Sequence, residues 1–333
     1  MSDFANLKNT LKQGALITAA NWPVILVQFI AESTFKLLLG VPVVGGVLLV
    51  ALALGRDVQD LLRGSVRDVV GNVAGALLDH PAAFGAFLAS AAVVIIGGSM
   101  LMFMIKAGTV TILVEGARRG TGIERSPLRV ATLRRATVFS ILRFSTACDR
   151  LFRRFVRLGG VLLAIYAGSA AVFLLMLVTA YQLSQTSTSI IGWTLTGALL
   201  SSVLVVWITV VNLFYLLTQM VVAAEDCAVR DGVRQVATFV RLEFRSVSLV
   251  FVLVLTFVML ATMASMLATA GLGLVSFVPL VGVAVLPLQA AAWLVRGVVF
   301  QYLGLSALSA YASLYHAADG CLSSRRDWRR TAS

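Results

Sequence analysis

The sequence predicts an all-α protein: a polytopic bundle of about six membrane-spanning helices, with interfacial amphipathic helices and both termini in the cytoplasm. Three observations predict this class. Hydrophobic residues make up 59% of the 333-residue chain and charged residues only 13%, whereas a soluble domain carries about 25% charged residues. Six long apolar stretches follow one another, and the connections between them alternate in charge. A bilayer is therefore the expected solvent.

The apolar stretches define the spans, because about 20 apolar residues can cross a bilayer as a helix. They lie within 22–55, 82–114, 158–181, 192–223, 247–270 and 288–315. Together they predict a transmembrane domain over 22–318. A polar, amphipathic segment (1–21) precedes this domain, and a basic tail (319–333) follows it. We expect both flanking segments in the cytoplasm.

Two apolar stretches leave an alternative open. Gly40, Pro42 and Gly45-Gly46 interrupt the first one, over 22–55. Because proline removes a helix hydrogen bond, this stretch predicts either one long kinked helix or a helix followed by a re-entrant segment. Residues 271–287 are apolar but broken by glycine and proline. They predict either a surface loop or a shallow re-entrant hairpin.

The charges of the connections predict the orientation. Segment 115–157 has eleven arginines and three acidic residues, whereas segment 56–80 has three arginines and four acidic residues. Positive connections stay on the cytoplasmic side. Both termini, 115–157 and 224–246 are therefore predicted inside, in a multi-pass protein of the bacterial inner membrane. The three cysteines then face a reducing compartment, and we expect no disulfide.

The arginine-rich connection predicts an amphipathic helix at the membrane surface. Ser126-Pro127 is a favourable helix start. Four arginines further on share one helix face, at spacings of three or four: Arg150, Arg153, Arg154 and Arg157. Such a stripe is suited to anionic lipid headgroups, each arginine contributing about 1 kcal/mol. The alternative is that these arginines only fix the orientation of the chain.

The stretch AEDCAVRDGVRQVATFVRLEFR, 224–245, has four basic and four acidic residues between two apolar spans. Its apolar residues recur as one helical stripe, and they are Val229, Val233, Val236, Val240 and Phe244. Glu225 and Asp226 fall at the expected start of this helix, where acids complement the helix dipole. We interpret this pair as a helix cap or, alternatively, as a contact with segment 115–157.

Charged residues within the apolar stretches are hypotheses of function, because a charge inside a membrane is costly. The four that stand out are Glu32, Lys36, Lys106 and Arg296. Glu32 and Lys36 are four apart and can pair on one helix. Glu32 and Arg296 are expected at similar depth and could meet, whereas Lys106 could extend to the surface. The network predicts either a substrate path or an ion pair that fixes packing.

Two patterns concern helix packing. Gly160, Ala164 and Gly168 predict a close helix contact on the third span, either within the bundle or with another chain. The segments PLRVATLRRATVFSILRF and GVRQVATFVRLEFRSVSLVF share the VAT core and a basic-apolar rhythm. They indicate an internal duplication of span, cytoplasmic helix and span, which would give parallel repeats.

One resemblance rests on Glu225-Asp226, the helix that follows them, and AYASLYHAADG at 310–320. These features resemble a group of bacterial six-span membrane proteins that are similar to the membrane domain of some glycerophosphodiester phosphodiesterases. The resemblance covers spans four to six best. It implies a prokaryotic integral membrane protein and supplies no catalytic residue. No soluble phosphodiesterase sequence is present, so phosphodiesterase activity is not implied.

Motifs for chemistry are missing from the sequence. It has no HExxH, GxSxG or phosphate-loop pattern, and its two histidines lie at span ends. We therefore expect no metal, no cofactor and no enzymatic activity. The first hypothesis is a scaffold, assembly factor or subunit of a membrane complex. The alternative is a transporter or lipid-handling permease that uses Glu32, Lys36 and Arg296. Expected partners are membrane lipids with anionic headgroups and other membrane subunits, not nucleic acid.

Overall fold

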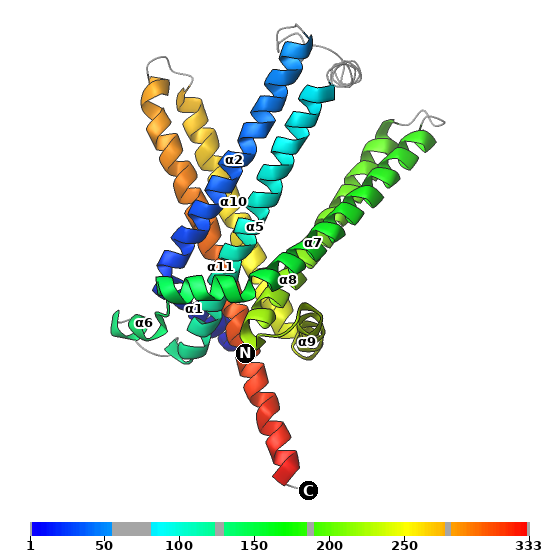
Figure 1. The fold of residues 1–333 in the computed structure, drawn as a ribbon. Helices are drawn as coiled ribbons and strands as arrows, with labels where there is room; N and C mark the ends of the chain where they lie inside the picture. The colour runs from blue at the N-terminus through cyan, green and yellow to red at the C-terminus, as the bar shows by residue number, and fades with distance from the viewer. Residues whose placement is uncertain (1, 55–80, 124–129, 185–189, 277–280, 332–333) are drawn as a thin grey trace. The chain divides into compact units, whose positions relative to one another are not determined.

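The computed structural model is helical throughout the residues that it describes (Figure 1). These residues are 2–54, 81–123, 130–184, 190–276 and 281–331. The chain divides into two compact units, and each is considered by itself. The larger unit consists of Met1–Leu26 and Lys106–Ser333, and the smaller one of Val27–Ile105.

Six of the described helices are long and apolar enough to cross a membrane. They are α2 (Trp22–Leu54), α5 (Pro81–Arg119), α7 (Ile141–Ser184), α8 (Ile190–Glu225), α10 (Phe244–Ser276) and α11 (Val281–Thr331). The prediction of six helices with the length and apolar composition of membrane spans is confirmed. The shortest has 33 residues and the longest 51, so they measure about 50 to 75 Å at 1.5 Å per residue. Because a hydrocarbon core is about 30 Å thick, every one of them extends beyond it.

The described residues also form three shorter helices, which are α1 (Ser2–Ala20), α6 (Val130–Ala136) and α9 (Val229–Leu242). They occupy the segments in which the sequence predicts surface helices. The predicted helix start at Ser126-Pro127 lies outside the described residues, as does segment 55–80. The side of the membrane on which the termini lie stays a prediction.

Both open stretches are mostly helix. Helix α2 continues through Pro42 to Leu54, which agrees with one long helix. In the other stretch, α10 continues to Ser276 and α11 begins at Val281. The helices therefore extend beyond the expected spans 247–270 and 288–315, whereas the candidate spans within them, Phe244–Gly273 and Pro287–Ala318, lie close to those bounds. The glycines and proline of 271–287 lie mostly within helix ends, where long apolar helices tolerate them.

In the smaller unit, α2 and α5 pack through two contacts, each between a phenylalanine ring and a glycine of the facing helix. A Cβ atom at Gly46 of α2 would lie 2.7 Å from the ring of Phe87 in α5. The ring of Phe35 in α2 likewise contacts Gly98 of α5. A side chain at either glycine would displace a ring, so these residues set how closely the two helices approach.

In the larger unit, the buried core gathers at one end of the spanning helices, which we call the core end. Its largest fully buried side chains come from α1, α5, α7 and α8, and they include Ile17, Ile112, Phe155, Leu217 and Met220. The opposite end, at the α7–α8 and α10–α11 connections, is called the distal end. Helices α7 and α8 pack together, as do α10 and α11 (Figure 1).

Toward the distal end, large apolar side chains are exposed. Leu163 is 69% exposed, Leu199 65% and Leu267 74%. Apolar surface of this extent marks a region that meets a membrane or another protein. The exposure therefore agrees with the membrane class that the composition predicts.

Helix α1 packs closely on α11 through small and polar residues. The Thr18 and Ser309 hydroxyl oxygens are 3.0 Å apart and both residues are fully buried. Tyr302 donates a hydrogen bond to the Ala15 carbonyl oxygen at 3.1 Å. A Cβ atom at Gly14 would lie 2.6 Å from the Ser306 carbonyl oxygen, so the two backbones nearly touch. The buried face of α1 thus combines Gly14 and Thr18 with the apolar Leu7 and Ile17.

Candidate functional site

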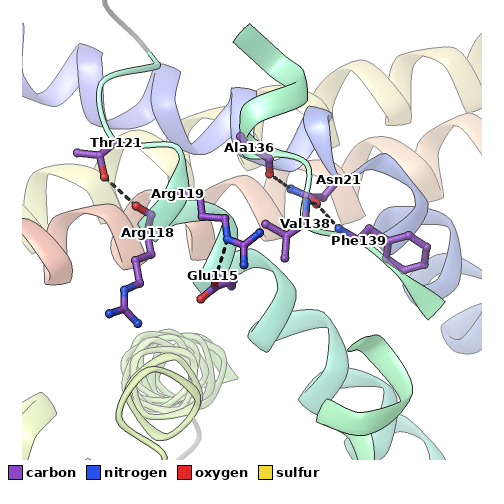
Figure 2. Close-up of polar contacts among 8 residues, drawn as sticks. All are labelled: Asn21, Glu115, Arg118, Arg119, Thr121, Ala136, Val138 and Phe139. Carbon is purple, nitrogen blue, oxygen red and sulfur yellow. Dashed lines mark hydrogen bonds and ion pairs between the residues drawn. The ribbon is translucent and has the colours of Figure 1, made fainter. Parts of the chain in front are cut away.

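A polar cluster at the core end centres on Asn21, the residue between α1 and α2. Proline at position 23 has no N–H to donate to the carbonyl oxygen four residues before it, which explains the break between the helices. The Asn21 side chain is fully buried. Its Nδ2 donates to the carbonyl oxygens of Ile17 and Ala136, both at 2.9 Å. Its Oδ1 accepts from the backbone N–H groups of Val138 at 2.8 Å and Phe139 at 3.1 Å (Figure 2).

This amide therefore uses both donors and both acceptor positions, which is its full hydrogen-bonding capacity. It satisfies backbone groups of Ala136, Val138 and Phe139, at the non-helical connection 137–140 between α6 and α7. No strong sequence pattern predicts this role for Asn21. The one available signal was a polar residue directly before Trp22-Pro23 at the start of an apolar run.

The end of α5 fits against this cluster through glycine. A Cβ atom at Gly116 would lie 3.0 Å from Ile17 and 3.2 Å from Asn21 Nδ2. Gln13 donates to the Gly120 carbonyl oxygen at 3.3 Å. In the last turn of α5, Arg119 pairs with Glu115 at 2.8 Å, and the Arg118 carbonyl oxygen accepts a hydrogen bond from Thr121 (Figure 2). Arg118 and Arg119 themselves are exposed.

The first five turns of α7 form an amphipathic segment, as the arginine stripe predicts. Arg150, Arg153 and Arg157 are exposed, whereas Arg154 is partly buried. The opposite face is buried in the core, and its members are Ala147, Cys148, Leu151, Phe155 and Leu158. Contact of the exposed arginines with anionic headgroups stays a hypothesis.

Arg154 differs from the other three because it has a protein partner. Its Nη1 donates a hydrogen bond to Asp226 Oδ1, and the two side chains form an ion pair. Asp226 adopts a φ of +50°, a left-handed conformation that aspartate tolerates better than most residues. The adjacent Glu225 accepts a hydrogen bond from the Tyr315 hydroxyl at 3.4 Å. The two acids thereby connect α7 and α11 to the end of α8.

The expected helix cap at Glu225-Asp226 is not present, and this prediction is corrected. Glu225 is the last residue of α8, and α9 begins at Val229 with Ala228 as its N-cap residue and no side-chain cap. Three residues therefore separate Glu225 from the helix that it was expected to start. The alternative, a contact with segment 115–157, is the arrangement observed for Asp226.

The buried stripe of α9 is also rotated relative to the predicted one. Gly232, Val236 and Phe239 are buried, whereas Val233 is 48% exposed. Gly232 explains the difference, since a Cβ atom there would lie 2.7 Å from Val222 of α8. The helix approaches α8 through its glycine. Phe239 then contacts Tyr315 edge-on, with ring centroids 5.4 Å apart, and Phe244 belongs to α10.

The surroundings of Cys227 change the pKa of its thiol. Burial raises the pKa of its thiol above the ordinary value, and the nearby carboxylates of Asp231 and Glu225 raise it further, whereas Arg154 lowers it. A thiol with a raised pKa is a poor nucleophile near neutral pH. Among the described residues, no group of three or more histidine, cysteine, aspartate or glutamate side chains could hold a metal ion.

The four charges within the spanning helices have different surroundings. In the smaller unit, Lys36 Nζ lies 2.6 Å from Glu32 Oε1, so the predicted pair on one helix face is confirmed. In the larger unit, the Lys106 ammonium lies 5.8 Å from the centre of the Tyr215 ring. The Arg296 guanidinium lies 5.8 Å from the centre of the Phe300 ring. The contact between Glu32 and Arg296 stays a prediction, because these residues belong to different units.

Two grooves lie within the helix pairs of the larger unit. The first, of about 430 Å³, lies between α7 and α8, and its residues include Gly168, Ser169 and Trp207. Trp207 donates to the Ser169 hydroxyl at 2.9 Å. The second, of about 610 Å³, lies between α10 and α11 toward the distal end. Arg296 is one of its lining residues.

The small residues of α7 are not packed inside the described chain. Gly160, Ala164 and Gly168 are all exposed. Nothing in the described residues lies within 4 Å of a Cβ atom built at Gly160 or Gly168. Close packing of these two glycines against another helix is therefore not observed among the described residues, and contact with another chain stays a prediction.

No family model, curated protein or solved structure matches this chain. The resemblance to the membrane domain of glycerophosphodiester phosphodiesterases therefore stays an expectation from the sequence. Function has to be argued from the arrangement of the chain's own residues.

Proposed function

We propose that the chain is a non-enzymatic integral membrane protein that serves as a scaffold, assembly factor or subunit of a membrane complex. One observation carries this proposal: the exposed small-residue face of α7, formed by Gly160, Ala164 and Gly168. Helices associate in membranes mainly through close packing, and small residues allow their backbones to approach. A face of this kind with open space beside its glycines is suited to a helix of another chain.

The core end supports the same role. Its Asn21 amide is fully satisfied within the chain by four hydrogen bonds. Such a cluster holds the connections between helices in fixed positions. A fixed core end is an arrangement expected of a membrane platform.

Purification from native membranes in a mild detergent tests the proposal. We expect another membrane protein to co-purify in fixed stoichiometry. In the variant with both Gly160→Leu and Gly168→Leu, its recovery should fall about tenfold, which corresponds to a loss of about 1.4 kcal/mol. The matched control is Leu163→Phe, which adds bulk at an exposed position on a neighbouring face of α7. Equal recovery with the glycine variant and with wild type would contradict the proposal.

A second candidate is a lipid-handling permease, and the groove between α10 and α11 with its charged Arg296 favours it. The test is movement of a fluorescent phosphatidylglycerol between leaflets in vesicles that contain the full chain. A permease should accelerate this movement, and Arg296→Gln and Lys36→Gln should each slow it. Movement no faster than in protein-free vesicles would remove this candidate.

A further inference from the structure

The groove between α10 and α11 combines a narrow apolar floor with one permanent charge. On α10 it is lined by small residues, among them Ala264, Ser265 and Ala268. On α11 it is lined by Gln289, Trp293 and Arg296. Small side chains leave room for a hydrocarbon chain, and the volume of about 610 Å³ falls in the range of small-molecule sites.

The sequence of α10 and α11 around the groove contains no acidic residue that could pair with Arg296. Between Ser246 and Ala318 it is the one residue with a permanent charge. Its described aromatic neighbour, Phe300, offers a ring face and no negative charge. A guanidinium in an apolar layer is costly unless an anion or water accompanies it. An anion that resides in the membrane and binds in this groove would offset that cost.

The position of the groove along α10 indicates where this anion comes from. Ser265 is about 20 residues from Arg245, so it lies about 30 Å along the helix from the core end. This distance equals the thickness of the hydrocarbon core. With Arg245 at the headgroups of one leaflet, the groove lies toward the other leaflet, and the long Arg296 side chain can extend toward the headgroups there. Trp293, one turn before Arg296, is of the type that lies at such an interface.

We propose that this groove is a binding site for an anionic phospholipid of the leaflet at the distal end. One acyl chain lies along Ala264 and Ala268, and the phosphate accepts hydrogen bonds from the Arg296 guanidinium. Arginine suits this role because its planar donors can bind a phosphate through two bonds. The site requires only that the chain spans a bilayer, so it is independent of the scaffold role proposed above.

Trp293 provides the readout, since it lines the groove. The full chain is reconstituted in vesicles with increasing amounts of phosphatidylglycerol that carries brominated acyl chains, which quench nearby tryptophan. The Trp293 signal is the difference between wild type and Trp293→Phe. Half of the quenching should require about five-fold less phosphatidylglycerol than brominated phosphatidylcholine. This ratio corresponds to about 1 kcal/mol for one arginine near an anionic surface.

Matched variants separate a specific site from general lipid contact. Arg296→Gln should reduce the preference from about five-fold to about one. Ala268→Phe should reduce quenching by both lipids, because it fills the groove. Two controls should retain the preference: Arg157→Gln, which removes an arginine elsewhere on the surface, and Val172→Phe, which fills the groove between α7 and α8.

Three results would overturn the proposal. They are equal quenching by both lipids in wild type, an unchanged preference in Arg296→Gln, and quenching that Ala268→Phe does not alter. If an acidic residue of a partner protein occupies the groove instead, Trp293 will respond to neither lipid until that partner is removed, and this result also counts against it. Each variant is used only if it elutes as a single folded species in size-exclusion chromatography. If Arg296→Gln does not fold, Ala268→Phe still tests whether the lipid occupies the groove.

Discussion

The hydroxyl oxygens of Thr18 and Ser309 lie 3.0 Å apart, although 291 residues separate them in the sequence. The contact joins the first helix to the last spanning helix. Beside it, Gly14 brings the backbone of α1 against Ser306 and Ala310 of α11. These residues make α1 a part of the core end.

Gly14→Ala should destabilise the protein. The new Cβ atom would lie 2.6 Å from the Ser306 carbonyl oxygen and 2.7 Å from the Ala310 nitrogen, and these backbone atoms cannot move aside easily. We expect a loss of about 1 to 3 kcal/mol, as for other overpacked sites. Thermal unfolding in detergent measures it. Gly304→Ala in α11 is the control, because no atom lies within 4 Å of a Cβ atom built at Gly304. This substitution should be neutral or slightly stabilising.

Asn21→Leu should destabilise the protein by about 2 to 4 kcal/mol. The substitution removes the partner that Asn21 provides to the N–H groups of Val138 and Phe139 and to the Ala136 carbonyl oxygen, and each buried group left unsatisfied costs about 1 to 3 kcal/mol. Chemical denaturation followed by circular dichroism gives the free energy of unfolding. Asn9→Leu, at an exposed position of α1, should change it by less than about 0.5 kcal/mol. A loss at Asn21 no larger than that at Asn9 would show that the cluster contributes little.

Arg154 and Asp226 should show a small, salt-sensitive coupling. Their side chains are 33% and 48% exposed, and exposed ion pairs contribute about 0.2 to 1 kcal/mol. A double-mutant cycle with Arg154→Gln and Asp226→Asn measures this coupling, because asparagine also tolerates the left-handed backbone at position 226. The coupling should diminish in 1 M salt. A coupling above about 2 kcal/mol would mean that the pair is far less hydrated than its exposure indicates.

Cys227 should be alkylated more slowly than an ordinary thiol near pH 8. Burial raises its pKa, so the reactive thiolate forms only at higher pH. Asp231→Asn should shift the rate profile to lower pH, because it removes a negative charge that opposes ionisation. Arg154→Gln should shift it to higher pH. Iodoacetamide labelling followed by peptide mass spectrometry resolves Cys227 from the other cysteines, and identical profiles for the two variants would contradict the electrostatic argument.

The sequence predicts the spanning helices well because their signal is local: a long apolar run specifies a helix in a membrane whatever its neighbours are. It also identifies the amphipathic start of α7, since the arginine stripe depends on helical periodicity alone. The single helix of α2 was left open, because a proline in a long apolar run fits both a kinked helix and a break.

The contacts between distant segments could not be read in the same way. Gly14, Thr18 and Asn21 carry no strong pattern, since their role depends on what α11 and the α6–α7 connection place opposite them. The stripe of α9 was misplaced for a related reason. Hydrophobicity favoured Val233, whereas close approach to α8 favoured Gly232. Packing through glycine is invisible to an argument that counts apolar residues.

The long separation between α1 and its partner has a consequence for biosynthesis. Thr18 leaves the ribosome 291 residues before Ser309, which amounts to about 15 to 60 s at 5 to 20 residues per second. During that interval the nascent helix has Gly14 and Thr18 on a surface without its final partner. Completion of the core end therefore has to wait for translation of the last span. A truncated chain that lacks this span should expose its first helix to proteases and membrane chaperones.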